Sequence, residues 1–318
     1  MSEPGGAIAV IGEALIDLVE ADDDAPRLAH PGGSPYNVAL GLARLGRRAC
    51  FVGRLSGDPL GTVLRNHALR SDVDLSFAVD AHEPSTVALV ELDPDGAAQY
   101  RFGVDGTADF RWTAAELARI PDDVTAVHFG SLASWLPPGD AAIAARVGEL
   151  RALGVAVTYD PNVRPHLQPD AAAAREQIEA AVSSAHLVKT SDEDLAYLYP
   201  DEPVEDVARS WLDLGPDVVV VTRGGAGSIA FTAELTIVRP PLRVDVVDTV
   251  GAGDAFMSGL LDALHGRGRL SPDGLADSVP WADVLDDAAL VAAITCSRAG
   301  ANPPRRAERD ELRASFRG

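Results

Sequence analysis

The second half of the chain alternates short apolar runs with segments in which apolar residues recur every three or four positions. The apolar runs predict buried strands and lie at 125–129, 155–159, 187–189 and 218–222. The segments with helical spacing lie at 141–153, 171–182, 204–214, 252–264 and 281–299. Because strands separated by helices pair in parallel, this order predicts an α/β fold with a doubly wound, mostly parallel sheet. In such a sheet, the loops at the carboxyl ends of the strands carry the functional site.

The first hundred residues begin with one buried strand, at 8–11, and continue with a different pattern. Further β-prone segments lie at 14–19, 86–92 and 97–102. The run Asp93-Pro-Asp-Gly96 joins the last two as a hairpin turn rather than a helix. We therefore predict a small separate β-sheet, whose strands are inserted at about 14–32 and 85–104 into a single domain of residues 1–318.

The composition indicates a reduced protein with no membrane or nucleic-acid partner. Hydrophobic residues make up 47% of the 318 residues, which is enough for a core without disulfides, and Cys50 and Cys296 form no C-x-x-C pair. No apolar run approaches the ~20 residues that span a bilayer, and the N-terminus lacks a secretory signal, so we expect a soluble, cytoplasmic protein. The net charge of −21 opposes contact with a phosphate backbone.

Lys189 is the only lysine in the chain, and its surroundings exclude two common nucleotide-binding devices. A P-loop needs a lysine directly after its glycine, whereas Lys189 follows Leu187-Val188. A protein kinase needs a G-x-G-x-x-G loop upstream of its lysine, and none precedes Lys189. The run Thr222-Arg-Gly-Gly-Ala-Gly227 does not satisfy the dinucleotide fingerprint, which argues against a dehydrogenase.

The segment with the strongest chemical signal is Asp248-Thr-Val-Gly-Ala-Gly-Asp254, where a β-prone run leads through glycines into a helix. The free N–H groups of Gly251, Ala252 and Gly253, at the positive end of that helix, can hold an anion. Asp254 lies in the first turn, where a carboxylate can remove a proton from an attacking hydroxyl. Glycine-rich turns also precede ordinary helices, so this segment alone leaves both interpretations open.

A second segment, Pro31-Gly-Gly-Ser-Pro-Tyr-Asn37, also places glycines ahead of a helix. Ser34-Pro35 marks the helix start and Gly46 its end. Gly32 and Gly33 expose backbone, and Asn37 lies on the first turn, away from the apolar stripe. An ordinary loop and helix start would give the same pattern.

Together the two segments resemble the signature regions of the ribokinase-like (PfkB) carbohydrate kinase family. They match G-G-x-x-x-N and D-T-x-G-A-G-D-x-F, and their order and separation extend the resemblance over nearly the whole chain. Bacterial fructokinases are the most similar members, on the segments Gly12-Glu-Ala-Leu-Ile-Asp17, Asp160-Pro-Asn-Val-Arg-Pro165 and Cys296-Ser-Arg-Ala-Gly-Ala-Asn-Pro-Pro304. The resemblance implies transfer of the γ-phosphoryl group of Mg-ATP to a sugar hydroxyl, with Asp254 as the base and the three preceding residues as the anion hole.

The resemblance also implies which residues bind the sugar. Asp17, Gly33 and Asn37 match positions that contact sugar hydroxyls, with Gly32 beside them. The small sheet matches a lid that closes over the sugar and can form a homodimer contact. Fructose is the leading acceptor, while 2-keto-3-deoxygluconate, ribose or a nucleoside remain alternatives. Arg101, on the returning lid strand, would favour the sugar acid if it reached into the site.

On the nucleotide side, the resemblance assigns Thr222, Gly224 and Gly227 to a nucleotide-binding turn, with Asn302 also at the nucleotide. Arg164 is the best placed arginine for the ATP phosphates, and Lys189 either touches a phosphate or ends a strand. A non-catalytic binding protein on the same scaffold is the remaining alternative, against which the intact Asp254 argues.

Two ion sites follow from the resemblance. Family members often carry N-x-x-E near the magnesium site, where this chain has Ser191-x-x-Asp194. Asp194 could organise water around Mg²⁺, although the same run is an ordinary capping box. A K⁺ site is implied at Asp248 and the carbonyls of Val250 and of residues near Gly300.

Overall fold

The computed structural model describes residues 6–19, 28–92, 98–121 and 124–316. Its main sheet contains eight strands in the order β14-β13-β12-β11-β10-β9-β1-β4. The strands are β1 (Ile8–Ile11), β4 (Ala49–Val52), β9 (Ala126–Gly130), β10 (Ala156–Asp160), β11 (Leu187–Ser191), β12 (Val218–Thr222), β13 (Ser228–Thr232) and β14 (Thr236–Arg239). All neighbours from β4 to β12 pair in parallel, and β13 and β14 add an antiparallel edge. The predicted doubly wound, mostly parallel sheet is confirmed.

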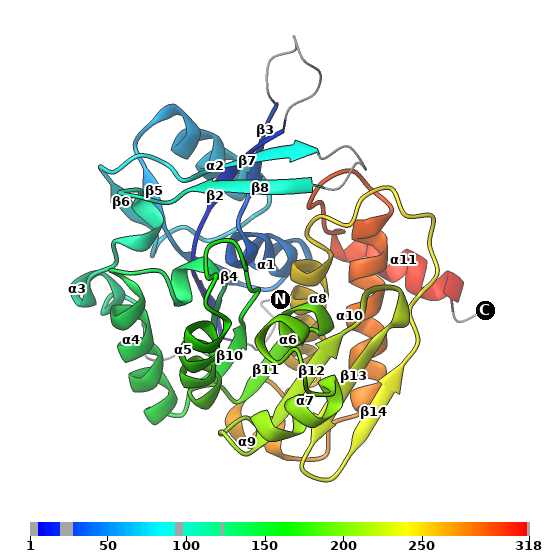
Figure 1. Ribbon diagram of the computed structural model, residues 1–318. Coiled ribbons are helices and arrows are strands. Elements are labelled where there is room, and N and C mark those ends of the chain that lie inside the picture. Colours follow the sequence, from blue (N-terminus) through cyan, green and yellow to red (C-terminus); the bar gives the residue numbers. More distant parts are fainter. Residues whose placement is uncertain (1–5, 20–27, 93–97, 122–123, 317–318) are drawn as a thin grey trace.

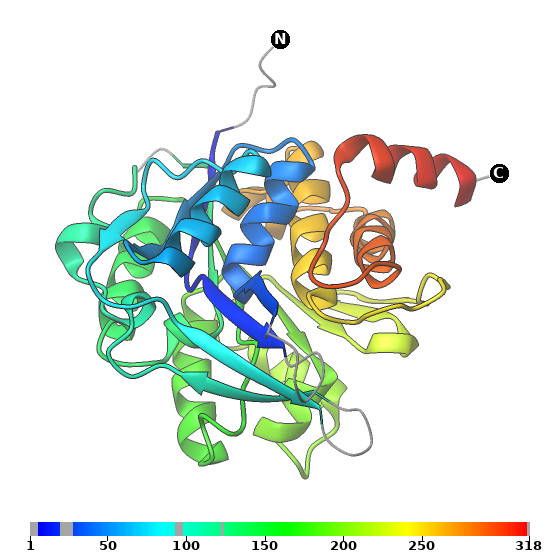
Figure 2. The ribbon, with the colours of Figure 1, turned by 90° about the horizontal axis from the view of Figure 1, so that it is seen from above.

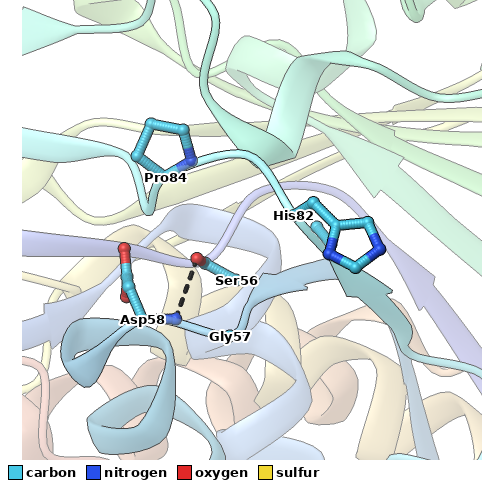
Figure 3. A pocket seen from close by; sticks show the side chains of 6 residues that line it. Ser56, Gly57, Asp58, His82 and Pro84 are labelled. Atoms are coloured by element: carbon cyan, nitrogen blue, oxygen red, sulfur yellow. Dashed lines mark hydrogen bonds between the residues drawn. The ribbon is translucent and has the colours of Figure 1, made fainter.

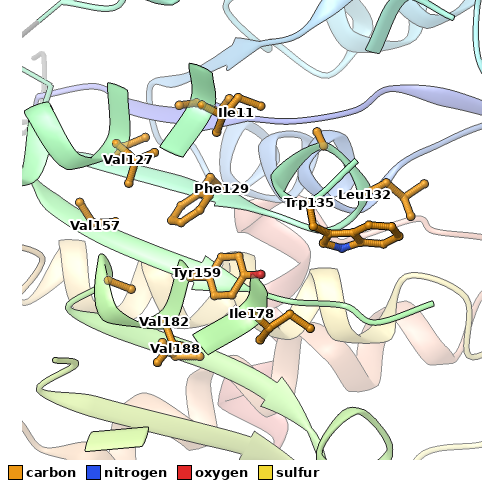
Figure 4. Packing of buried hydrophobic residues seen from close by; sticks show 14 of the residues in the cluster. Ile11, Val127, Phe129, Leu132, Trp135, Val157, Tyr159, Ile178, Val182 and Val188 are labelled. Carbon is orange, nitrogen blue, oxygen red and sulfur yellow. The ribbon is translucent and has the colours of Figure 1, made fainter. Parts of the chain in front are cut away.

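Side chains alternate along each strand between two apolar cores. Ile8 and Val10 face the helices α1 (Ser34–Arg44), α2 (Pro59–Arg70), α8 (Ala252–Gly266) and α10 (Trp281–Cys296). Ala9 and Ile11 face the helices α4 (Asp140–Ala152), α5 (Ala171–Ser183), α6 (Asp192–Leu198) and α7 (Val204–Leu212). Figure 4 shows this second core. Burial on both faces explains why the strands appear in the sequence as continuous apolar runs.

A second sheet, the lid, contains four strands in the order β3-β2-β7-β8. They are β2 (Leu15–Val19), β3 (Leu28–Gly32), β7 (Val87–Leu92) and β8 (Ala98–Gly103). Figures 1 and 2 show the lid as a separate layer at one end of the main sheet. The small separate sheet expected from the sequence is therefore present, while the turn predicted at Asp93–Gly96 lies outside the described residues.

The remaining elements are short or peripheral. They are the strands β5 (Arg54–Ser56) and β6 (Val79–Ala81), which pair with each other, and the helices α3 (Ala114–Leu117), α9 (Pro272–Ala276) and α11 (Arg306–Phe316). No helix in the described part of the chain is long and apolar enough to cross a membrane.

The topology brings the chemically marked segments together. After β1, the chain passes to β4 on one side of the sheet and later returns to β9 on the other, so the carboxyl end of β1 is a switch point where ligands bind. Helices α1 and α8, which follow the two glycine segments, pack side by side on one face (Figure 1). Both helices therefore begin near the same edge of the sheet.

Candidate active site

Asp254 lies where α1 and α8 meet. Its helix begins at Gly251, whose left-handed φ of 74° favours glycine, and Asp254 occupies the first turn. Ser34 Oγ donates to Asp254 Oδ1 at 2.6 Å, and Asn37 Nδ2 donates to Oδ2 at 2.8 Å. Both donors come from the first turn of α1, more than two hundred residues earlier in the chain. The two glycine segments thus form one site around this carboxylate.

The surroundings of Asp254 make it a stronger base than an exposed aspartate. Burial raises the pKa of this carboxyl, while the hydrogen bonds from Ser34 and Asn37 and the charge of Lys189 oppose the rise. A raised pKa strengthens a general base, provided that the group stays ionised at the working pH. Asn37 Oδ1 is buried without a hydrogen-bond partner, so it can accept a bond from a hydroxyl bound next to Asp254.

Lys189 reaches the beginning of α8 from the neighbouring strand β11. Its buried Nζ lies 2.8 Å from Asp160 Oδ2, and a Cβ atom added at Gly253 would stand 3.0 Å from the same Nζ. Burial alone would lower the pKa of Lys189, but the charges of Asp160, Asp194 and Asp254 raise it. A permanent positive charge therefore lies beside the turn predicted to bind an anion.

The anion hole differs in one detail from the sequence prediction. The amide of Ala252 donates to the Thr249 carbonyl at 3.1 Å, so this N–H is already used within the turn. The amides of Gly253 and Asp254, in the first turn of α8, have no acceptor within the helix. These amides and the Lys189 ammonium together provide the positive surroundings that a phosphoryl group requires.

Asp17, on β2 of the lid, faces the same site. Burial raises its pKa to about 6, the charge of Arg164 opposes this rise, and the charge of Asp254 adds to it. A Cβ atom at Gly32 would stand 2.3 Å from Asp17 Oδ2, and one at Gly33 would stand 2.5 Å from the Glu13 carbonyl oxygen. Both glycines are therefore required sterically where the lid meets α1.

Arg164, in the loop after β10, lies on the lid side of the site. Burial raises the pKa values of both Asp17 and Glu13, and the positive charge of Arg164 opposes this rise. Arg164 Nη1 donates to Asn162 Oδ1 at 2.8 Å. Glu13 is fully buried at the carboxyl end of β1, where it accepts the amide of Ala133 at 3.1 Å. Arg164 therefore lies close to the predicted sugar ligand Asp17, and its contact with the ATP phosphates stays a prediction.

Arg101 does not lie on the same face of the lid as Asp17. The paired rows of the lid place Asp17, Ala88 and Phe102 on one face, where Ala88 and Phe102 pack against the core shown in Figure 4. Arg101 is opposite Leu89 in the neighbouring row, so it belongs to the other face and is exposed. The predicted sugar contact of Arg101 is therefore wrong within one subunit, because a shift of one residue reverses the face of a strand.

Phe102, the next residue along β8, lies on the same face of the lid as Asp17. Its ring stacks on that of His166 in the body, with centroids 5.4 Å apart and an angle of 11° between the planes. This contact joins the last lid strand to the loop that also carries Arg164.

Asp194 is used mainly to cap α6. Its Oδ1 accepts the amide of Val163 at 2.9 Å and its Oδ2 accepts the amide of Ser191 at 3.1 Å, in a reciprocal capping box. Within the described residues, no cluster of three or more His, Cys, Asp or Glu side chains suits a metal ion. Asp160 Oδ1, in contrast, is buried without a partner. Water around Mg²⁺ therefore fits Asp160 better than Asp194.

The segment before α8 and the segment after α10 are joined by Asp248. Its Oδ1 accepts the amide of Val250 at 3.0 Å and its Oδ2 accepts the amide of Gly300 at 2.7 Å. The carbonyl oxygens predicted to hold K⁺ thus belong to one connected pair of loops. Asn302 lies nearby, but its Oδ1 accepts Arg44 Nη1 at 2.6 Å, which turns this oxygen toward α1.

The predicted nucleotide turn lies between β12 and β13. Thr222 Oγ1 donates to the Thr190 carbonyl at 3.2 Å, which ties the ends of β12 and β11 together. Gly224 and Gly227 both have positive φ, and a Cβ atom at Gly227 would stand 2.1 Å from the Arg239 carbonyl oxygen. The glycines are explained by a tight turn at the carboxyl edge of the sheet.

Three residues of the site were missed as site residues in the sequence: Ser34, Asp160 and Glu13. The sequence predicts Ser34 as the helix cap, yet the N-cap residue is Gly33 and the Ser34 hydroxyl donates to Asp254. Asp160 follows a predicted strand, and both Asp160 and Glu13 stand in the segments that resemble fructokinases, so the sequence held a signal for each.

Comparisons with known proteins agree with this geometry. Residues 6–308 match the family described as pfkB family carbohydrate kinase. A fructokinase from Rhizobium leguminosarum bv. trifolii is 33% identical over 301 residues, covering 94% of this chain and 87% of that protein.

Two solved structures are also similar. The fructokinase of Xylella fastidiosa with bound ATP has a TM-score of 0.90 at 26% identity, covering 98% of this chain and 99% of its own. A double mutant of the fructokinase from Vibrio cholerae O395, in its fructose-, ADP- and potassium-bound form, has a TM-score of 0.82 at 27% identity, covering 95% of both chains. The chain described here therefore belongs to the pfkB family of carbohydrate kinases.

Proposed function

We propose that this protein is an ATP-dependent sugar kinase that transfers the γ-phosphoryl group to a hydroxyl of fructose. The observation that carries the proposal is the half-buried Asp254 carboxylate at the beginning of α8, held by Ser34 and Asn37. The fructokinase relatives, with ATP in one structure and fructose with ADP in another, support the choice of both substrates.

In the proposed reaction, Asp254 accepts the proton of the attacking sugar hydroxyl. The sugar oxygen forms a bond to the γ-phosphorus as the bond between that phosphorus and the β,γ-bridging oxygen breaks, so ADP leaves with the bond electrons. The amides of Gly253 and Asp254 and the Lys189 ammonium receive the negative charge on the transferring group. Closure of the lid excludes water, which would otherwise compete with the sugar.

On the sugar side, Asp17 and Asn37 bind hydroxyls, while Gly32 and Gly33 leave room for the lid to approach α1. Arg164 lies beside Asp17. Its positive charge therefore offsets the negative charge of the γ-phosphoryl group where that group meets the sugar.

On the nucleotide side, we assign the turn containing Thr222, Gly224 and Gly227 to ATP, at the carboxyl edge shared with Lys189. Asn302 is a weaker candidate, because its carbonyl oxygen already accepts a bond from Arg44. When bound, Mg²⁺ neutralises charge on the β- and γ-phosphates. Asp160, through its unpartnered Oδ1, and Asp194 are the carboxylates that we assign to its water shell.

For K⁺, we propose the loops joined by Asp248, with carbonyl oxygens of Val250 and of residues near Gly300 as ligands. The potassium-bound form of the Vibrio cholerae fructokinase variant supports a monovalent ion as a partner of this fold.

We propose that the lid forms a homodimer contact, because its edge strand β8 carries the exposed Arg101. Light scattering checks this, and a monomer at micromolar concentration would contradict it.

The test of the function is an acceptor panel with purified protein, Mg-ATP and K⁺. We expect ADP release to depend on fructose, and to be slower with 2-keto-3-deoxygluconate, ribose and nucleosides. Release that no sugar stimulates, together with measurable sugar binding, would instead indicate a non-catalytic binding protein.

A further inference from the structure

The chain passes between body and lid at several points, and three of these meet at one buried carboxylate. β2 begins at Leu15, β7 begins at Val87 and β8 ends at Gly103. Asp109, in the 3₁₀ turn Ala108–Phe110 that follows β8, is only 1% exposed. It lies beside all three junctions.

The contacts of Asp109 connect the three junctions directly. Its Oδ1 accepts the amide of Ala14, immediately before β2, at 2.9 Å. Its Oδ2 accepts the hydroxyl of Thr86, immediately before β7. Thr86 Oγ1 lies 2.8 Å from Thr107 Oγ1, which follows β8. Removing this carboxylate would therefore loosen all three strands where they enter or leave the lid.

The segments next to these junctions also form hydrogen bonds with residues of the body. Asp58, at the beginning of α2, accepts both the amide and the hydroxyl of Ser85, each at 2.8 Å. Arg54 donates to the carbonyl of Ala108 at 2.9 Å. Figure 3 shows this side, where Ser56 and Asp58 lie across a pocket from His82 and Pro84. Asp109 thus belongs to a buried, hydrogen-bonded base of the lid.

Burying an ionised carboxylate at the position of Asp109 lowers the free energy of unfolding. Burial raises the pKa of Asp109 to about 7, and the neighbouring charge of Glu13 adds to the rise, while the bonds from Thr86 and Ala14 oppose it. A neutral residue of the same size would avoid that cost. A residue kept at a cost in stability suggests a need for well-defined geometry.

The group that needs a well-defined position is the carboxylate of Asp17, which we propose binds the sugar. Asp17 follows Ala14 by three residues along β2, so the position of the Ala14 amide sets the position of the Asp17 carboxylate. We propose that Asp109 is a positioning residue, which fixes the base of the lid and thereby places Asp17 against the sugar. This inference rests on the proposed function.

The test compares Asp109→Asn and Asp109→Ala with Asp287→Asn. Asp287 is also a buried aspartate, but it pairs with Arg267 and Arg313 in the body, far from the lid in sequence and contacts. We expect Asp109→Ala to raise the KM for the sugar at least ~10-fold, the effect of about 1.4 kcal/mol, with a change of under about twofold in the KM for ATP. Asp109→Asn, which keeps one acceptor oxygen, should show a smaller change in the same direction. Asp287→Asn should leave both KM values unchanged.

A second measurement does not depend on turnover. Hydrogen exchange of the amides of Ala14 and of β2 should become faster in Asp109→Asn and stay unchanged in Asp287→Asn, while α8 keeps its protection in both. If Asp109→Ala does not fold, Thr86→Val removes one of the same contacts and takes its place.

Equal rises in both KM values, or unchanged exchange in β2, would overturn the positioning role. Wild-type protein without sugar-dependent turnover would instead overturn the proposed function, while the exchange result would still decide whether Asp109 fixes the lid.

Discussion

Replacing Asp17 by asparagine should make the protein more stable and a poorer kinase. Burial raises the pKa of Asp17 from 3.8 to about 6, so its ionised form is unfavourable in the folded protein. Below pH 3.8 the carboxyl is neutral in both the folded and the unfolded state, so it does not lower the free energy of unfolding. Between pH 3.8 and 6 the folded state holds more protons than the unfolded state, so stability falls as the pH rises, and above 6 the full cost is present.

The size of this effect follows from the shift. The rise in pKa from 3.8 to about 6 lowers the free energy of unfolding by about 3 kcal/mol at pH 8, and by about half of that at pH 5. Because Asp17 is only partly buried, screening by solvent reduces the full effect to about 1–3 kcal/mol. An asparagine side chain at this position would carry no such cost. Asp17→Asn should therefore gain stability over wild type, and more at pH 8 than at pH 5.

The assay is urea denaturation at pH 5 and pH 8, followed by tryptophan fluorescence, together with sugar kinetics. The same variant should raise the KM for fructose by about 10–100-fold, the effect of losing a charged hydrogen-bond acceptor. Asp105→Asn, at an exposed aspartate shortly after β8, is the matched control and should change neither property. A stability difference that does not grow between pH 5 and pH 8 would refute the reasoning.

Three further predictions concern the same site. Gly32→Ala should raise the KM for sugar about 10-fold or more, because the new Cβ would stand 2.3 Å from Asp17 Oδ2, and a change below twofold would contradict this clash. K⁺ should raise activity over a large organic cation at equal ionic strength, whereas equal rates would argue against an ion at Asp248. Fructose should give a higher kcat/KM than 2-keto-3-deoxygluconate, since the carboxylate of the acid would face Asp17 in a closed site. The opposite order would show that the acceptor, though not the kinase chemistry, is wrongly assigned.

The sequence predicted those parts of the fold that depend on local pattern. The strand at 8–11 and the helices at 171–182 and 252–264 lie within a few residues of their predicted bounds, because their apolar spacing is regular. The helix expected at 281–299 ends at Cys296, before the left-handed Gly300. The antiparallel strands β13 and β14 were not predicted, although each pairs with the strand directly before it in the chain. β14 alternates between exposed and half-buried residues, so it lacks a continuous buried run.

Site residues that belong to a local motif could be predicted from the sequence. Residues whose role depends on a contact with a distant part of the chain could not. Asp254 and its glycines form one continuous segment, whereas Ser34 reaches Asp254 across 220 positions. Lys189 could be identified as unusual, but its pairing with Asp160 depends on β10 and β11 being neighbours in the sheet. Arg101 was misplaced because a sequence pattern does not fix the register of a four-stranded sheet.

The central claim is that Asp254 is the base of an ATP-dependent sugar kinase, and Asp254→Asn tests it most directly. The amide is nearly the same size as the carboxylate but cannot accept the proton. We predict a fall in kcat of about 10²–10⁴-fold, with fructose and ATP binding, measured by calorimetry, nearly unchanged. Asp287→Asn, measured alongside, should retain the wild-type kcat. A fall in kcat of less than tenfold in Asp254→Asn would contradict the account.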